Sequence, residues 1–185
     1  KKDISVQLIY CGAQDATWEA AAKIAKSDLM TIDQNKVAAH VAAPQDDEIL
    51  RLGDELNSTY IAYGREGQAS MYRQKAADMS SAKMSKKVAI ERMKLKTKKA
   101  YDNYNWDMVD AVDKKQNFLE TAKEEELPAE LRGKTLAEKK ETVAAAAKKR
   151  AEIKAKIAQL EQARSEFVKA EKAKTGVKDE PSLDS

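Results

Sequence analysis

Few side chains in this 185-residue sequence are of the types that perform covalent chemistry or bind transition metals. The chain has one cysteine, Cys11, and one histidine, His40. Zinc sites, Cys–His nucleophile pairs and internal disulfides all need more of these residues than the sequence supplies. The spacing also shows no nucleophile–base pair and no paired carboxylates. We therefore predict a chain without enzymatic activity, with no catalytic residues and with no metal or other cofactor site of its own.

The remaining reactive or polar residues have structural explanations. Cys11 ends an apolar run, where a small buried hydrophobe is expected. The acidic run 46–48 suits the first turn of a helix, where negative charge is favourable. Trp106, with Tyr101 and Tyr104 nearby, could stack on a ligand, but aromatic residues beside an apolar helical stripe are more typical of a core. These residues are therefore more typical of packing and helix capping than of a binding site.

One stretch carries a strong positive charge. Residues 76–99 contain eight Lys or Arg and two Asp or Glu, whereas the whole chain has a net charge of +3. Clustered lysines neutralise phosphates, so nucleic acid or an anionic membrane surface is a conceivable partner. Helical spacing spreads these charges around a helix, which favours a solvated face or an acidic protein, argues against nucleic acid and leaves the membrane surface as a weaker alternative. The candidate contact residues are Lys83, Lys86, Lys87, Arg92, Lys94, Lys96, Lys98 and Lys99.

The composition predicts that helices position most of these residues. Charged residues make up 35% of the chain and aromatic residues 5%, against about 25% charged in an average globular protein. Six glycines and three prolines argue against a sandwich or a barrel. No apolar run approaches the roughly 20 residues of a membrane-spanning helix. Residues 1–6 lack the apolar segment of a signal peptide.

The first third of the chain shows a different pattern. Residues 4–11 are rich in β-branched and aromatic residues and end at Gly12, which predicts a strand followed by a turn. A helix over residues 18–25 and a second short apolar run at 29–32 complete a strand–helix–strand unit with a parallel pair of strands. A further helix over residues 46–60 is expected to pack on this sheet.

Downstream, the apolar residues recur at steps of three and four. This period predicts one helix over about residues 68–125 and another over about 135–174, which fold back as an antiparallel helical hairpin. The chain turns between them at residues 127–134, where Gly133 suits a left-handed backbone conformation. Residues 175–185 show no core pattern and are predicted to be a disordered tail.

Two features distinguish the second of these helices. Thr135 and Glu138 have the spacing of a capping box, and Arg150 and Arg164 interrupt an Ala-rich heptad seam. The seam supports an alternative function, a coiled-coil or helical structural scaffold. The two arginines make a long dimeric coil less attractive.

Several segments of the sequence form a recognisable set: Ile9-Tyr10-Cys11-Gly12, Thr31-Ile32-Asp33, Leu56-Asn57-Ser58-Thr59-Tyr60, Asn105-Trp106-Asp107 and Leu127-Pro128-Ala129-Glu130-Leu131-Arg132-Gly133-Lys134. They resemble the C-terminal part of a bacterial von Willebrand factor type A (VWA) domain and the helical extension that follows it in one group of bacterial proteins. The resemblance implies an α/β remnant in residues 1–66, holding the last two parallel strands and helices of a doubly wound VWA-type sheet. It implies a mainly α extension in residues 67–174.

The same resemblance implies a function. VWA domains bind protein ligands through a divalent cation held by an Asp-x-Ser-x-Ser motif, which does not occur in this sequence. Mg²⁺ is therefore expected only on an N-terminal half of the domain, upstream of Lys1. The implied partners are that N-terminal half and an unidentified protein ligand, with the helical extension as a protein–protein contact surface. The resemblance is compatible with the periplasm or the cell envelope.

Overall fold

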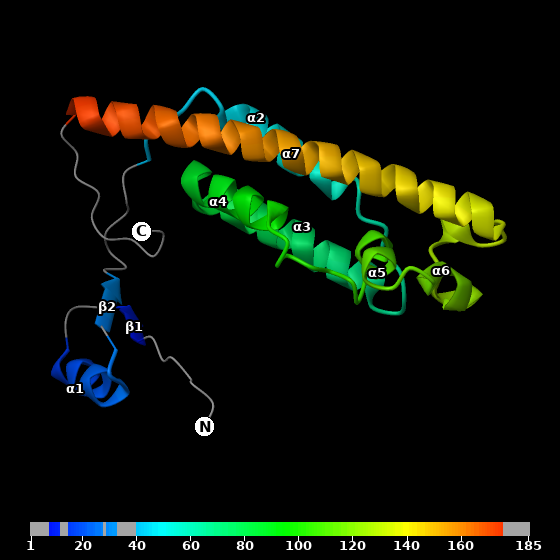
Figure 1. The fold of residues 1–185 in the computed structure, drawn as a ribbon, viewed down its shortest axis with the longest axis horizontal. Coiled ribbons are helices and arrows are strands. Elements are labelled where there is room, and N and C mark those ends of the chain that lie inside the picture. Colours follow the sequence, from blue (N-terminus) through cyan, green and yellow to red (C-terminus); the bar gives the residue numbers. More distant parts are fainter. Residues whose placement is uncertain (1–7, 12–14, 28, 33–39, 176–185) are drawn as a thin grey trace. The chain divides into compact units, whose positions relative to one another are not determined.

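A computed structural model describes residues 8–11, 15–27, 29–32 and 40–175. The described chain is predominantly helical (Figure 1) and divides into two compact units. The described residues before 33 belong to the smaller unit, and residues 40–175 form the larger one. None of the described helices is both long and apolar enough to span a membrane.

The smaller unit is a short ladder with one helix. Its strands pair in parallel, with Leu8 opposite Leu29. The helix is capped by Asp15, whose carboxylate accepts a hydrogen bond from the Thr17 N–H at 2.8 Å. Within the helix of this unit, Ala22 is buried. Its elements are β1 (Leu8–Cys11), α1 (Ala16–Ala25) and β2 (Leu29–Ile32).

The predicted α/β fold class was wrong. The described residues form seven α-helices, and the two four-residue strands pair only with each other, which does not make a doubly wound sheet. Helix formers fill most of the sequence, and the β-branched runs are too short to outweigh them. The chain is a mainly α protein. Residues 4–7 of the predicted first strand and residues 176–185 of the predicted tail lie outside the described residues.

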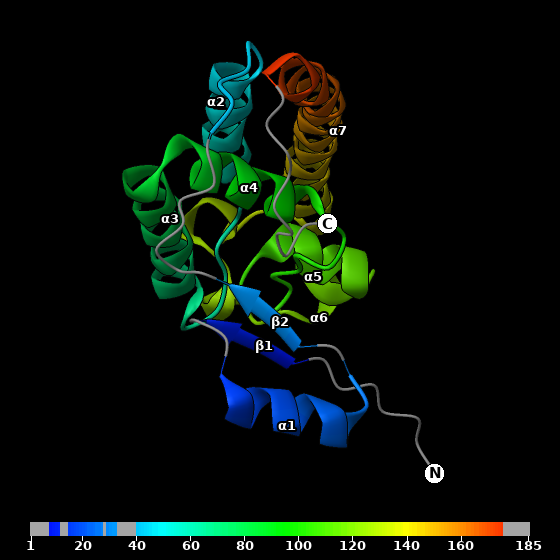
Figure 2. The ribbon, with the colours of Figure 1, turned by 90° about the vertical axis from the view of Figure 1, so that its left-hand side faces the viewer.

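The larger unit is built along one 40-residue helix, α7. Figure 1 shows α2 beside the C-terminal half of α7 and shows α5 and α6 next to its N-terminal half. Figure 2 looks along α7, with α4 below α2 and α7, and with α3 against α4. The helices are α2 (Asp46–Asn57), α3 (Gly67–Met84), α4 (Lys86–Thr97), α5 (Met108–Lys114), α6 (Phe118–Thr121) and α7 (Leu136–Thr175), with 3-10 turns η1 (Glu124–Glu126) and η2 (Ala129–Leu131).

Helix α2 belongs to this bundle and not to a sheet. The sequence predicts that it packs on the strands, within a unit that ends at residue 66. It packs instead on α4 and α7, and the larger unit begins at His40. The α2–α4 contact is close because Gly53 faces Met93, and a Cβ at Gly53 would overlap the Met93 side chain. The apolar face of α2, which the sequence predicted to cover the sheet, therefore packs against other helices of the bundle.

The predicted helix over about 68–125 is divided into four shorter helices. Ser85 ends α3 and begins α4, and its hydroxyl accepts a hydrogen bond from the Val88 N–H at 3.1 Å. Asp107 begins α5 by accepting from the Asp110 N–H at 3.0 Å. Short polar side chains of this kind bind free backbone N–H groups and so start new helices.

The second predicted helix was correct, and so was its capping box. Helix α7 runs over Leu136–Thr175. The Thr135 hydroxyl accepts from the Glu138 N–H at 3.3 Å, while the Glu138 carboxylate accepts from the Thr135 N–H at 2.8 Å. This reciprocal pair satisfies two backbone donors that the helix start would otherwise leave free.

Two apolar clusters lie along α7. The first contains Trp106 and Tyr60, whose ring centroids are 5.5 Å apart, so the interpretation of Trp106 as a core residue is confirmed. The first cluster consists of Ile49, Leu52, Leu56, Tyr60, Ile90, Met93, Trp106, Ile153 and Ile157. The second consists of Met108, Val109, Leu119, Leu127, Leu131 and Val143.

The turn before α7 gives a first test. Gly133 has φ 71°, and a Cβ added there would meet no other atom within 4 Å, so a substitution acts through backbone strain alone. We expect Gly133→Val to lower the free energy of unfolding by about 1 kcal/mol or more in urea titrations. Gly133→Asn is the control, because asparagine tolerates this conformation better. Equal stability of both variants and the wild type would contradict this account of the turn.

Candidate functional site

The predicted basic contact residues do not share one surface. Lys96 is fully buried, and its Nζ donates to Asn57 Oδ1 and Asp78 Oδ2, each at 2.7 Å. Arg92 also donates to Asp78. Burial by itself raises the pKa of Asp78, but the hydrogen bond and charge of Lys96 outweigh it and hold this pKa below its ordinary value. Burial lowers the pKa of Lys96.

The other basic residues of this stretch point to different neighbours. Lys86 pairs with Asp47 at 2.6 Å, and Lys94 pairs with Glu91 at 3.4 Å. The remaining four, which are half-buried or exposed, are Lys83, Lys87, Lys98 and Lys99. Half of the predicted contact residues are thus engaged in ion pairs that hold α2, α3 and α4 together or lie along α4.

Asp46, the first residue of the acidic run at the start of α2, joins this end of the unit to α7. Asp46 is fully buried and accepts from Arg164 Nε at 2.6 Å and from the Ala43 N–H at 3.1 Å. His40 Nε2 lies 3.0 Å from the same carboxylate. Burial acts to raise the pKa of Asp46, but the hydrogen bonds from Arg164 and Ala43 lower it overall. The Cys11 side chain lies outside the described residues.

Arg150, on α7, has every donor of its guanidinium satisfied. Its Nε donates to Thr59 Oγ1 at 3.0 Å, and one terminal nitrogen donates to Thr59 O at 2.7 Å and Asp107 Oδ1 at 3.2 Å. The other terminal nitrogen donates to Asp107 Oδ2 at 2.6 Å and Asp110 Oδ1 at 2.8 Å. These bonds use all five N–H groups of the side chain. The Tyr60 ring also packs on the guanidinium, with its centroid 4.3 Å from Cζ.

Asp107 is saturated in the same way. Its side chain is fully buried, and each oxygen accepts one bond from Arg150. Oδ1 accepts a further bond from the Ile61 N–H at 2.8 Å, and Oδ2 accepts from the Asp110 N–H at 3.0 Å. A carboxylate has about four acceptor positions, so none is left over. The pair is therefore a closed structural unit with no free group for chemistry.

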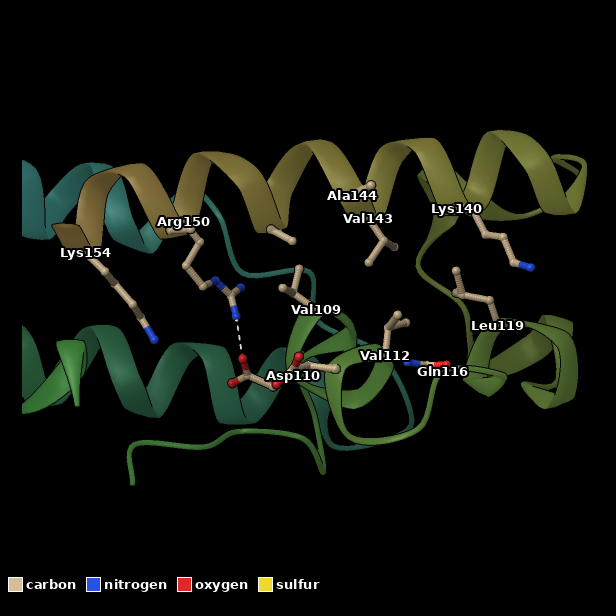
Figure 3. A pocket seen from close by; sticks show the side chains of 13 residues that line it. Val109, Asp110, Val112, Gln116, Leu119, Lys140, Val143, Ala144, Arg150 and Lys154 are labelled. Atoms are coloured by element: carbon tan, nitrogen blue, oxygen red, sulfur yellow. Dashed lines mark hydrogen bonds and ion pairs between the residues drawn. The ribbon is translucent and has the colours of Figure 1, made fainter. Parts of the chain in front are cut away.

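An apolar groove lies directly beside this pair, between α7 and the helices α5 and α6. Figure 3 shows Val109, Val112 and Leu119 facing Val143 across it. The groove has a volume of about 560 Å³. It is lined by Val109, Asp110, Val112, Asp113, Gln116, Leu119, Lys140, Val143, Ala144, Ala147, Arg150, Ala151 and Lys154.

Charged side chains mark the two ends of the groove. Lys140, at one end, pairs with Glu120 at 2.8 Å. Lys154, at the other end beyond Arg150, is half-buried, and burial lowers its pKa. Asp110 lies below Arg150. Burial raises the pKa of Asp110 overall, although the hydrogen bond from the Asn103 N–H and the charge of Arg150 act to lower it. The middle of the groove is apolar.

Sequence reasoning noted Arg150 only as an interruption of an apolar seam and did not predict this site. Asp107 and Asp110 have the spacing of a helix cap and its third residue, a signal that marks the start of α5. Ala144, Ala147 and Ala151 recur at helical spacing, but small residues in a helix do not by themselves indicate a groove. The facing wall comes from a segment distant in sequence, so only the fold shows it.

Comparisons with models of protein families, with curated proteins and with solved structures found no match to this chain. The resemblance to VWA domains therefore stays a prediction. In the part of the chain that the structure describes, no group of three or more His, Cys, Asp or Glu side chains is placed to hold a metal ion.

The buried ion pair gives a second test. Arg150→Met should lower the free energy of unfolding by about 3–5 kcal/mol, because Asp107 would be left buried without a counter-charge. Arg51→Met is the control, since Arg51 is half-exposed and its ion pairs are within α2. The double variant Arg150→Met, Asp107→Asn should recover part of the loss. Urea titrations measure all three, and equal stability of Arg150→Met and Arg51→Met would contradict the analysis.

Asp78 gives a third test, through pH. A carboxylate whose pKa is lowered by folding stabilises the protein above its unfolded pKa of about 4, and this contribution is lost as the pH falls through the folded pKa. We expect the free energy of unfolding to decrease below about pH 4 and to decrease less steeply in Asp78→Asn. Asp113→Asn, at an exposed position, is the control. Identical pH profiles for wild type and Asp78→Asn would show that the Lys96–Asp78 contact contributes nothing to acid stability.

Proposed function

We propose that this chain is a non-enzymatic protein-binding module, and that the groove between α5, α6 and α7 receives an α-helical segment of a partner protein. The observation that carries the proposal is the apolar middle of the groove, which is open to solvent and lies between two charged ends. Exposed apolar grooves of this kind are a recurrent binding site for amphipathic helices.

The wall formed by α7 suits a helical ligand. Ala144 and Ala151 are exposed and Ala147 is half-buried, so this face of α7 has no large side chain to fill the space. Small residues allow a second helix to approach closely, while Val112 and Leu119 on the opposite wall supply apolar contacts. Among the described residues that line the groove there is no Ser, Thr, Cys or His, so it offers no hydroxyl, thiol or imidazole group for catalysis.

The two alternative functions have less support. In a coiled-coil scaffold the α7 seam would face another chain, but Val143, Ile153 and Ile157 of that seam are buried within this chain. Binding of an anionic polymer or membrane through residues 83–99 would need those charges on one face, and Lys96 and Arg92 are instead committed to Asp78.

A second hollow, of about 620 Å³, is a poorer candidate for a binding site. It lies between α2, α3 and α4 and includes Asn57 and Asp78. Asn57 donates to Asp78 at 2.8 Å, and both accept from Lys96, so these polar groups already have partners within the chain.

Selection of helical peptides tests the proposal. A displayed library of amphipathic helical peptides is selected on the full chain, and binding is then measured by fluorescence anisotropy. We expect Ala147→Glu, which places a charge in the middle of the groove, to weaken binding by tenfold or more. Ala145→Glu is the matched control, because Ala145 is exposed on the same helix and does not line the groove. Peptides that bind both variants equally would place their site elsewhere and contradict the proposal.

A further inference from the structure

Among the described residues that line the groove, Lys154 is the one cation whose charge is not paired within the chain. It projects from α7 at the end of the groove beyond Arg150 (Figure 3) and is half-buried. In the part of the chain that the structure describes, its ammonium group has no hydrogen-bond or ion-pair partner. Lys140, the other lysine of the groove, is paired with Glu120. A partly desolvated cation without a partner is unfavourable in the free protein.

None of the nearby carboxylates that the structure describes makes a direct ion pair with Lys154. Asp107 has all its acceptor positions filled. Asp110 accepts from Arg150 with one oxygen and from the Asn103 N–H with the other, at 2.8 Å and 2.9 Å. Asp113 is exposed, where water and salt screen its charge. Asp110, Asp107 and Asp113 attract the Lys154 charge at longer range, and Arg150 repels it. Among the described residues, what this end of the groove lacks is a carboxylate in direct contact with the Lys154 ammonium group.

We infer that the partner helix carries an Asp or Glu side chain that pairs with Lys154 at the end of the groove. This inference rests on the proposed function, and it names the chemistry of the partner. Burial of the groove by an apolar helix would remove still more water from Lys154, so a partner without an acid would leave this cation unpaired in an interface. A partner with an acid at that end forms an ion pair in a desolvated setting, where such a pair discriminates between ligands.

The dimensions of the groove fix the form of the ligand. Lys140 and Lys154 are separated by about 21 Å along the α7 axis, or about four helical turns. A matching ligand is a helix of about 14 residues, with apolar residues at three- and four-residue spacing and an acid in one terminal turn. Either the first or the last turn can hold the acid, because the ligand helix can run in either direction along α7.

Synthetic peptides test the inference on the full chain. The probes are fluorescein-labelled helical peptides of about 14 residues with a leucine stripe, each carrying Glu, Gln or Lys in the first turn or in the last turn. In anisotropy titrations we expect one Glu peptide to bind about tenfold more tightly than its Gln counterpart. Lys154→Gln should remove this difference. Lys156→Gln is the matched control, because Lys156 is exposed on the same helix and lies outside the groove.

Reversing the charge at position 154 distinguishes a lost ion pair from a misfolded variant, because a misfolded variant would bind no peptide. Lys154→Glu should reverse the preference, so that the Lys peptide binds more tightly than the Glu peptide. Equal binding of Glu and Gln peptides to the wild type, with both weakened by Ala147→Glu, would overturn the inference and leave the groove as a helix-binding site. If no peptide binds, or if Ala147→Glu leaves binding unchanged, the proposed function fails and the inference fails with it.

Discussion

The ion pair between Arg150 and Asp107 fixes how the parts of the larger unit fit together. Along α7, Arg150 lies between Val143 of one apolar cluster and Ile153 of the other, and Asp107 likewise lies between Trp106 and Met108. The pair thus forms a polar layer between two apolar cores. Two buried charges are tolerable only if every hydrogen-bonding position is filled, as it is here. Any other alignment of α7 would leave both charges unpaired in apolar surroundings, so this layer specifies one arrangement.

A second arginine fixes the position of the other end of α2 against α7. Arg164 pairs with Asp46 at the start of α2, while Arg150 binds Thr59 just after its end. The two arginines are about 21 Å apart along a helix axis, close to the rise between Asp46 and Thr59. Two polar contacts at matched spacing hold α2 and α7 antiparallel and in register. This register also determines the geometry of the groove, because Val143, Ala147 and Lys154, which line it, are all on α7.

The sequence predicted the features that depend on local signals. The helical composition, the capping box at Thr135 and the turn at Gly133 all follow from residues close together in the chain. The α/β class failed because a four-residue extended run, such as Leu29–Ile32, says little about the size of a sheet. Arg150 and Arg164 were recognised only as interruptions of an apolar seam, since the residues that bind them are far away in sequence. Lys154 looks like any surface lysine until α5 is placed opposite it.

Helix α3 is attached to the bundle in a different way from its neighbours. Of its residues, all of which the structure describes, only Gly67 and Gln74 are buried, and Tyr72 and Met79 are exposed. Its links are largely polar: Asp78 pairs with Lys96 and Arg92, and the buried Gln74 accepts from Tyr101, while Met71 adds an apolar contact with the first cluster. Such a helix can separate in a sub-global opening that leaves most of the two apolar cores in place. That opening would hydrate a lysine that is otherwise completely enclosed, so the electrostatic share of its free energy is larger than in global unfolding, where burial of apolar surface dominates.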